Sequence, residues 1–491
     1  MKRFVTPLLA LSLFLMSVTP ALAQLNPGSA VVNFTVQNLD AAADANVQAT
    51  YVNQSGGVAV RVPASGSIKI PKESSLGFPA SQSGLPSGFE GSAIVSGDRE
   101  LAGFAQVLFS GGTSSDGKTL AAYNAFTAGA TKLYFPSLAA RANRQFSTLT
   151  IMSAENPSTT ELINFSIKFY DRNGNLNTTV NDSVRKGSQK TFNLLNQPLP
   201  TTTPPGDGWL GSAVVESASP IAGVALTHWE QYSAGYSGVT GGGTTAFLPS
   251  GTRRLPAGPF EQFTAIQVQN LDPAAAADVT VRWFDRTGAL LHSFTDSIPA
   301  NSSKGYNTRF DTSNVPNHTA LFNALGNNWN GSVVIESTNG KNIVAIANLQ
   351  WTAISGPGES ASAYASAPEG KATIYVPGAF RRVSGSTWEQ YTGLIVQNVG
   401  GAACNNFDVI WKDRDGIVKL DHKDSLAPNI SHGYNTRVDS DLTALGENPA
   451  DLGNQFRGSV TFKAPGCSLI AIHNTLFPEW TDSSTYNAFG K

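Results

Sequence analysis

Residues 329–337, Trp-Asn-Gly-Ser-Val-Val-Ile-Glu-Ser, are one of four related blocks that decide the fold. The other blocks begin as Phe89-Glu-Gly-Ser92, Trp209-Leu-Gly-Ser212 and Phe456-Arg-Gly-Ser459. Their glycines, at 91, 211, 331 and 458, are 120, 120 and 127 residues apart. Each block is followed by an apolar run of nine residues that ends on an aromatic side chain: Leu101–Phe109, Ile221–Trp229, Ile343–Trp351 and Leu469–Phe477. A fixed period of this kind predicts a repeat protein, here with four diverged copies of about 115 residues.

Strand signals dominate each copy. Residues 277–284 alternate apolar and polar side chains and are rich in β-branched and aromatic types, as half-buried strands are. The turn Asp285–Gly288 and a return strand over 289–294 complete a predicted hairpin. About seven or eight such strands per copy predict an all-β chain of four tandem β-sandwiches. The predicted units are residues 24–130, 131–245, 246–370 and 371–491, named repeats 1 to 4 below, and a single short helix is expected over 319–325, with a shorter counterpart over 442–445.

Other motifs recur at matched positions in the copies. Val-Gln-Asn occurs at 36–38, 268–270 and 396–398, with Ala154-Glu-Asn156 as the divergent copy, and Tyr-Asn-Ala-Phe occurs at 123–126 and 486–489. Together with the Phe/Trp-x-Gly-Ser block and segments such as Leu133-Tyr-Phe-Pro136, they resemble uncharacterised secreted bacterial proteins with tandem immunoglobulin-like sandwiches. The resemblance covers essentially the whole chain after the leader. It implies an immunoglobulin-like fold and no catalytic residues.

The first 23 residues are predicted to be a secretory signal peptide. Lys2 and Arg3 precede an apolar stretch from 7 to 18, and Ala21-Leu-Ala23 is a small-residue cleavage site before Gln24. A helix needs about 20 apolar residues to span a bilayer, and this stretch is too short. No second apolar run of spanning length follows. We therefore expect an extracellular or cell-surface protein without a transmembrane segment in the mature chain.

The charge content excludes one class of partner. The chain is 14% charged and carries a formal net charge of -2, which becomes -4 when Lys2 and Arg3 are removed with the leader. Proteins that bind nucleic acid normally carry a basic excess or a basic patch. No nucleic-acid partner is expected.

The two cysteines, Cys404 and Cys467, are both in repeat 4. In an oxidising compartment a disulfide between them is the favoured interpretation, and two buried free thiols are the alternative. Residues 24–403 have no cysteine, so zinc or iron–sulfur chemistry based on cysteine clusters has no ligands there.

One type of segment occurs only three times, as Leu133-Tyr-Phe-Pro136, Ala246-Phe-Leu-Pro249 and Ile374-Tyr-Val-Pro377. The favoured interpretation is a linker strand at each of three junctions. The alternative makes each segment a strand of the sandwich, which leaves one terminal repeat a strand short. An open sheet edge pairs readily with another chain, and head-to-tail pairing generates filaments.

Catalytic and cofactor chemistry has little support. Residues 112–119 match the phosphate-loop pattern, but a strand-like segment follows them where a helix is required. The six histidines are scattered, and His228 and His473 are predicted to be ordinary strand residues. Asp171, Asp285 and Asp413 are predicted to be turn residues because too few carboxylates surround them for calcium. We expect no enzyme activity, no metal and no cofactor.

The predicted function is a non-enzymatic structural or adhesive surface protein that self-associates or binds other cell-surface proteins, with head-to-tail filaments as one form. The alternative is an extracellular carbohydrate-binding protein. It would recognise surface glycans through aromatic side chains near strand ends or in loops, for which the candidates are Trp229, Tyr232, Trp388, Tyr391 and Trp480. A hydrolase with dispersed carboxylates is a third and weaker alternative.

Overall fold

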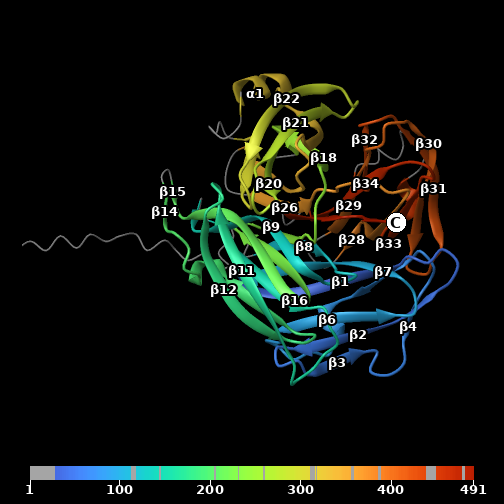
Figure 1. Ribbon diagram of the computed structural model, residues 1–491. Helices are drawn as coiled ribbons and strands as arrows, with labels where there is room; N and C mark the ends of the chain where they lie inside the picture. Colours follow the sequence, from blue (N-terminus) through green and yellow to red (C-terminus); the bar gives the residue numbers. More distant parts are fainter. Residues whose placement is uncertain are drawn as a thin grey trace, which may run out of the picture.

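The structure, a computed structural model, describes residues 28–111, 118–142, 145–203, 206–229, 232–257, 260–309, 316, 318–354, 359–384, 389–437, 449–477 and 482–491. The predicted leader, most of the phosphate-loop match and the helical turn expected at 442–445 lie outside these residues. Within them the chain is all-β, as predicted (Figure 1). The described helices are α1 (His318–Leu325), where a short helix was expected, and the 3-10 turns η1 (Ala80–Gln82), η3 (Leu194–Asn196) and η4 (Pro449–Leu452).

Repeat 1 forms two antiparallel sheets. The first has the order β5 (Ser75–Phe78), β1 (Gly28–Asn38), β7 (Leu101–Gly111) and β8 (Lys118–Asn124). In the second, β2 (Ala45–Asn53) pairs with β3 (Val58–Val62), β4 (Ile68–Ile70) and β6 (Gly91–Gly97).

Repeat 2 is organised around one long strand. This strand, β16 (Trp209–His228), is 20 residues long and joins all other long strands of the repeat into one seven-stranded sheet. Its partners are β9 (Ala130–Ala140), β10 (Phe146–Ser153), β11 (Leu162–Asp171) and β17 (Ser233–Ser237), with β12 (Leu176–Arg185) on β11 and β13 (Gln189–Asn193) on β10. A two-residue pair, β14 (Thr202–Thr203) and β15 (Gly206–Asp207), lies apart.

Repeats 3 and 4 repeat one two-sheet plan. The first sheet of repeat 3 has the order β18 (Thr245–Arg253), β24 (Trp329–Ser337), β21 (Ala277–Asp285), β22 (Leu290–Ile298). Its second sheet has the order β19 (Leu255–Ala257), β20 (Phe260–Asn270), β25 (Ile343–Ala353), β26 (Glu359–Ala365), and β23 (Ser303–Asn307) pairs with β20. The first sheet of repeat 4 has the order β31 (Val418–Leu426), β30 (Cys404–Asp413), β33 (Phe456–Lys463), β27 (Thr373–Arg381), β36 (Phe489–Gly490). Its second sheet has the order β28 (Val383–Ser384), β29 (Glu389–Asn398), β34 (Leu469–Phe477), β35 (Asp482–Asn487), and β32 (Ser431–Asn435) pairs with β29.

The three segments expected to be linkers are sheet strands, so the linker interpretation is wrong. Each lies in the first strand of its repeat, in β9, β18 or β27. These strands pair antiparallel with β16, β24 and β33, and their apolar side chains complete the cores of repeats 2, 3 and 4. In repeat 1 the strand equivalent to β16, β24 and β33 is β6. Among the described residues β6 pairs with β2 alone.

The glycine of the Phe/Trp-x-Gly-Ser block is required by close strand packing. A Cβ atom on Gly331 would lie 1.8 Å from the carbonyl oxygen of Phe284 on the neighbouring strand, and 2.9 Å from the Trp329 ring. The equivalent distances to a neighbouring carbonyl are 2.1 Å at Gly91, 2.1 Å at Gly211 and 1.9 Å at Gly458. No side chain fits at this position because the aromatic ring of the block covers the glycine from one side and the hairpin strand from the other.

Replacing Gly331 with alanine is expected to lower the free energy of unfolding by about 1–3 kcal/mol, because β21 and β24 must separate to admit the methyl group. Chemical denaturation of the purified protein measures the change. The control is Gly241→Ala, since a Cβ atom there meets nothing within 4 Å and its backbone is not left-handed. Equal stability of the two variants would contradict the packing argument.

The last main strands of the four repeats meet at one place. β8 contacts β17 and β35, and β26 contacts the same two strands. Each repeat therefore touches the next, and repeat 4 touches repeat 1 (Figure 1). The described chain closes on itself around these four strands and is not an open rod.

Candidate functional site

The serine of each Phe/Trp-x-Gly-Ser block lies at a contact between repeats. The Ser459 hydroxyl donates to the Glu73 carbonyl at 2.8 Å, so it joins repeat 4 to repeat 1. The Ser212 hydroxyl donates to the Asn301 carbonyl at 3.0 Å in the same way, and Ser92 donates to the carbonyl of Gly187. At the contact between repeats 3 and 4, the Gln397 amide donates to the Ser332 hydroxyl at 2.8 Å instead. The block therefore joins neighbouring repeats as well as shaping each one.

The residue whose backbone carbonyl accepts the serine hydroxyl has left-handed backbone geometry. Its φ is 73° at Gly187, 56° at Asn301 and 55° at Glu73, and Asn429 of repeat 4 has φ 64°. Glycine and asparagine adopt this geometry readily, whereas glutamate does so rarely. Glu73 therefore departs from the local preference at a contact that joins repeat 1 to repeat 4.

Glu73 forms a buried ion triad with two lysines of repeat 4. Its carboxylate lies 2.9 Å from the ammonium of Lys412 and 2.6 Å from that of Lys463. The side chains of Glu73 and Lys412 are 4% and 9% exposed, so both charges are removed from water. Burial would by itself raise the pKa of Glu73, but the lysine hydrogen bonds outweigh it and hold this pKa below its ordinary value.

Polar side chains also pair where the four last strands meet. The Asn124 amide donates to the Asn487 carbonyl at 2.6 Å, which joins repeats 1 and 4. The Asn487 amide donates to the Ala365 carbonyl of repeat 3 at 2.6 Å, and the Ser237 hydroxyl of repeat 2 donates to the Asn124 carbonyl at 2.7 Å. One set of hydrogen bonds thus links all four repeats. The asparagines belong to the repeated Tyr-Asn-Ala-Phe motif, which gives that motif a structural reason.

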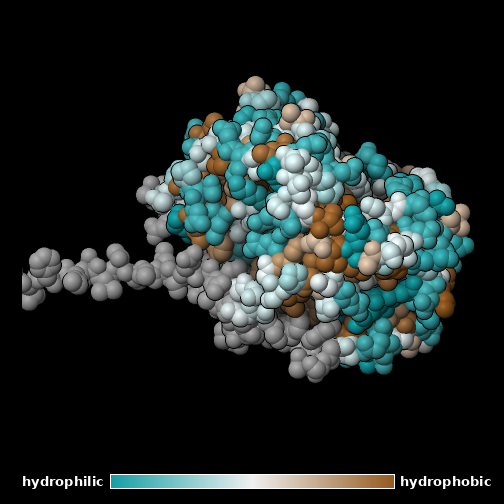
Figure 2. Space-filling model, turned by 90° about the horizontal axis from the view of Figure 1, so that it is seen from below, coloured by the Kyte–Doolittle hydropathy of each residue, from teal (hydrophilic) through white to brown (hydrophobic). Residues whose placement is uncertain are grey.

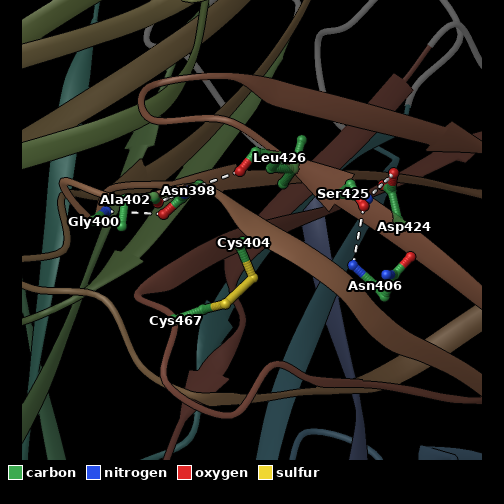
Figure 3. The surroundings of a disulfide bond; sticks show 9 residues. All are labelled: Asn398, Gly400, Ala402, Cys404, Asn406, Asp424, Ser425, Leu426 and Cys467. Carbon is green, nitrogen blue, oxygen red and sulfur yellow. Dashed lines mark hydrogen bonds between the residues drawn. A yellow bond between two sulfur atoms is a disulfide. The ribbon is translucent and has the colours of Figure 1, made fainter.

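A disulfide joins Cys404 and Cys467, with a sulfur–sulfur distance of 2.08 Å and a Cα–Cα distance of 5.5 Å (Figure 3). Cys404 begins β30, and Cys467 lies in the loop between β33 and β34. Near the bridge, the Asn398 amide donates to the carbonyls of Ala402 and Leu426. Asn38 and Asn270 make the same contacts in repeats 1 and 3, so the last residue of the Val-Gln-Asn motif holds a loop.

The aromatic residues predicted to bind sugar are not a surface platform where the structure describes them. Tyr232 and Tyr391 are 5% and 7% exposed, so the prediction that they lie on the surface is wrong. Tyr232 is stacked on Trp229, at 4.7 Å between ring centres, and Trp229 packs against the core of repeat 2. Tyr391 lies within β29, where β34 pairs beside it. Trp388 and Trp480 lie outside the described residues.

The two strand histidines are buried and paired with hydroxyl groups. His228 Nδ1 lies 2.9 Å from Ser233 Oγ, and His473 Nε2 lies 3.0 Å from Thr392 Oγ1. Burial lowers the pKa of His228 to about 4 and that of His473 to about 3. Both side chains are therefore neutral at pH 7 and serve packing, in agreement with their prediction as strand residues.

Acid is expected to destabilise the fold through His473. A histidine whose pKa is lowered by folding takes up its proton mainly in the unfolded chain, so stability falls as the pH drops below about 6.5. At pH 5 the loss from His473 is about 2 kcal/mol. Denaturation of the protein and of a His473→Gln variant at pH 7 and pH 5 measures it. The variant should lose less stability between the two pH values, and an equal loss would contradict the assignment.

The hairpin aspartates are turn residues, as predicted. The Asp285 carboxylate accepts hydrogen bonds from the backbone N–H groups of Thr287 at 2.8 Å and Ala289 at 2.9 Å. Asp171 and Asp413 make equivalent bonds in their own hairpins. No group of three or more His, Cys, Asp or Glu side chains that could hold a metal ion occurs in the described part of the chain.

A comparison with models of known protein families and with curated protein sequences finds no match to this chain. Among the described helices, none is long and apolar enough to cross a membrane.

Proposed function

We propose that this chain is an exported, non-enzymatic structural or adhesive protein, built from four immunoglobulin-like β-sandwich repeats that form one ring. The supporting observation for the sandwich is that β-strands of each repeat enclose an apolar cluster: one around Val47 in repeat 1, Ile167 in repeat 2, Trp283 in repeat 3 and Trp411 in repeat 4. Trp283 and Trp411 are fully buried, as expected for core residues.

The observation that carries the proposal is the use made of the buried polar groups. The Asn124–Asn487 pair and the Glu73 triad both join one repeat to another, and His473 is held by a threonine. The asparagine pair and the triad thus hold repeats of the ring together, and His473 is engaged within repeat 4. A rigid body with few charges suits a protein that presents surfaces to other molecules.

The ring changes the form that self-association would take. A head-to-tail filament needs the first repeat of one molecule to meet the last repeat of another. In the described chain repeats 1 and 4 meet within one molecule. Assembly in the proposed function would therefore use a surface outside these contacts.

Expression of the full chain in a secreting bacterial host tests the proposal. The expected result is an exported protein whose first residue is Gln24, which makes coated beads adhere to cells of the source organism and turns over no substrate in a broad hydrolase panel. Retention inside the cell with Met1 still present, or turnover of any substrate, would contradict it.

A further inference from the structure

Repeat 1 has an open sheet edge at β6. In repeats 2, 3 and 4 the strand equivalent to β6 lies between two partners, one of which is the first strand of the repeat. Among the described residues, β6 has β2 on one side and no strand on the other. Its outward N–H and C=O groups are therefore free to pair with an added strand.

Side chains that face the interior are uncovered at this edge. Ala93 is exposed and Val95 is partly exposed, whereas the equivalent Val333 and Ile335 of repeat 3 are fully buried. On β1 of the facing sheet, Val32 is 39% exposed. Figure 2 looks at the side on which β2, β3 and β6 lie in Figure 1, and it shows hydrophobic residues gathered near the middle of that face.

A tyrosine beside the open edge lacks the partner that its equivalents have. The hydroxyl groups of Tyr236, Tyr364 and Tyr486 donate to the carbonyls of Ser137, Ser250 and Gly378, which each follow the proline of a first strand. Tyr123 occupies this position in repeat 1, and its hydroxyl has no hydrogen-bond partner among the described residues. The hydroxyl is protonated at neutral pH and able to donate, and burial raises its pKa further, to about 12.

The three occupied positions define what fits the open one. Each holds an extended segment with the order aliphatic, aromatic, large apolar, proline, at Leu133–Pro136, Ala246–Pro249 and Ile374–Pro377, with alanine as the smallest first residue. If the leader is removed after Ala23, as the sequence predicts, residues 24–27 stay ahead of Gly28, fewer than the nine residues of β18 or β27.

The fit is restricted to the first part of such a strand. In repeats 3 and 4 the residues after the proline are held by a threonine hydroxyl, which accepts from the N–H of Thr252 or Phe380. The equivalent residue of repeat 1 is Val32, which cannot accept a hydrogen bond. The added segment is therefore short and is recognised mainly through its aliphatic, aromatic, large apolar and proline residues.

We propose that the β6 edge of repeat 1 binds an extended segment of another protein chain that carries the order aliphatic, aromatic, large apolar, proline. The segment adds as an antiparallel strand beside Gly91–Gly97 and places its apolar side chains against Ala93 and Val95, as β18 does against β24. The inference rests on the proposed adhesive function and deepens it, because it names the class of protein that would bind to the β6 edge.

A synthetic peptide with the sequence of residues 372–381 is the probe. Binding to the purified, disulfide-intact chain is measured by fluorescence anisotropy, and hydrogen exchange locates the bound peptide. The expected result is saturable binding with new protection confined to Gly91–Gly97. A peptide carrying Ile374→Ser, Tyr375→Ser and Val376→Ser should bind at least about tenfold more weakly, because the pockets for alternate side chains give specificity.

Two protein variants control for the site. Ala93→Lys places a charge at the open edge on an exposed residue and should weaken peptide binding at least about tenfold. Ala274→Lys makes the same change at an exposed turn of repeat 3 and should leave binding unchanged.

Four results would overturn the proposal. The first is that the peptide does not bind, and the second is that it protects residues outside β6 because it has replaced β27. The third is that residues 1–27 already protect β6 in the free protein. The fourth is that the free protein forms a dimer in which β6 is protected. The adhesion of coated beads is measured separately with Ala93→Lys protein. Beads that still adhere while the peptide fails to bind would leave the proposed function standing and remove only this inference.

Discussion

Replacing Glu73 with glutamine is expected to lower the free energy of unfolding by about 3–5 kcal/mol, because it leaves the buried ammonium of Lys412 without a counter-charge. The two side chains are 4% and 9% exposed, and the ion pair measures 2.9 Å. Removal of one partner from such a pair is far more costly than removal of both. Denaturation of the purified variant measures the loss.

A second ion pair across the same contact is the control. The Lys491 ammonium lies 2.6 Å from the Glu100 carboxylate, but both side chains are more than half exposed. Solvent screens such pairs, so Glu100→Gln should change stability much less than Glu73→Gln. Similar losses in the two variants would show that burial of the triad is not what matters.

The pH dependence of the Glu73 contribution has a defined sign. Since folding lowers the pKa of Glu73, its contribution is complete above the ordinary glutamate pKa and is lost as the pH falls through the lowered value. The wild type should therefore lose more stability than Glu73→Gln when the pH is taken well below 4.5.

Removal of the disulfide is expected to lower the free energy of unfolding by about 4 kcal/mol in the chain-entropy description. Cys404 and Cys467 are 63 residues apart, so the bridge constrains a long loop of the unfolded chain. Alanine is the suitable replacement at both positions, because Cys404 is fully buried and packs against the core of repeat 4. Denaturation of Cys404→Ala/Cys467→Ala protein measures the change.

Reductant provides the control for the disulfide prediction. Wild-type protein denatured with reductant should approach the double variant in stability, whereas the variant should not respond. Wild-type protein that is equally stable with and without reductant would contradict the assignment.

Local sequence patterns predicted much of the fold. The alternation in 277–284 and the turn at 285–288 became β21 and its hairpin, and the nine-residue apolar runs became β7, the second half of β16, β25 and β34. These features depend on residues close in sequence. The short helix expected over 319–325 followed for the same reason and is α1 (His318–Leu325).

Contacts between distant residues were the part that sequence reasoning missed. The triad joins Glu73 to Lys412 and Lys463, more than 300 residues away, and no periodicity connects them. One signal was present: repeats 2, 3 and 4 have Gly187, Asn301 and Asn429 where repeat 1 has a glutamate. A charged residue at a position suited to glycine or asparagine indicates a specific partner, although it does not identify that partner.

The prediction of surface aromatic residues that bind sugar was wrong for a related reason. Tyr232 and Tyr391 lie close to predicted strand ends, where exposure is a reasonable expectation, but neighbouring strands cover them. The three proline-containing segments were counted correctly. Their pairing with β16, β24 and β33 could not be derived from the count, because a strand that joins two repeats and a strand that completes one have the same sequence pattern.

Zero-length carbodiimide cross-linking of the purified protein tests most directly whether repeat 4 closes onto repeat 1. The reagent joins a carboxylate to an amine only when the two are in contact, and mixed isotope-labelled and unlabelled protein distinguishes bonds within one molecule from bonds between two. The ring predicts a cross-link between Glu100 and Lys491 within single molecules. Absence of this cross-link, or its formation only between molecules, would contradict the ring.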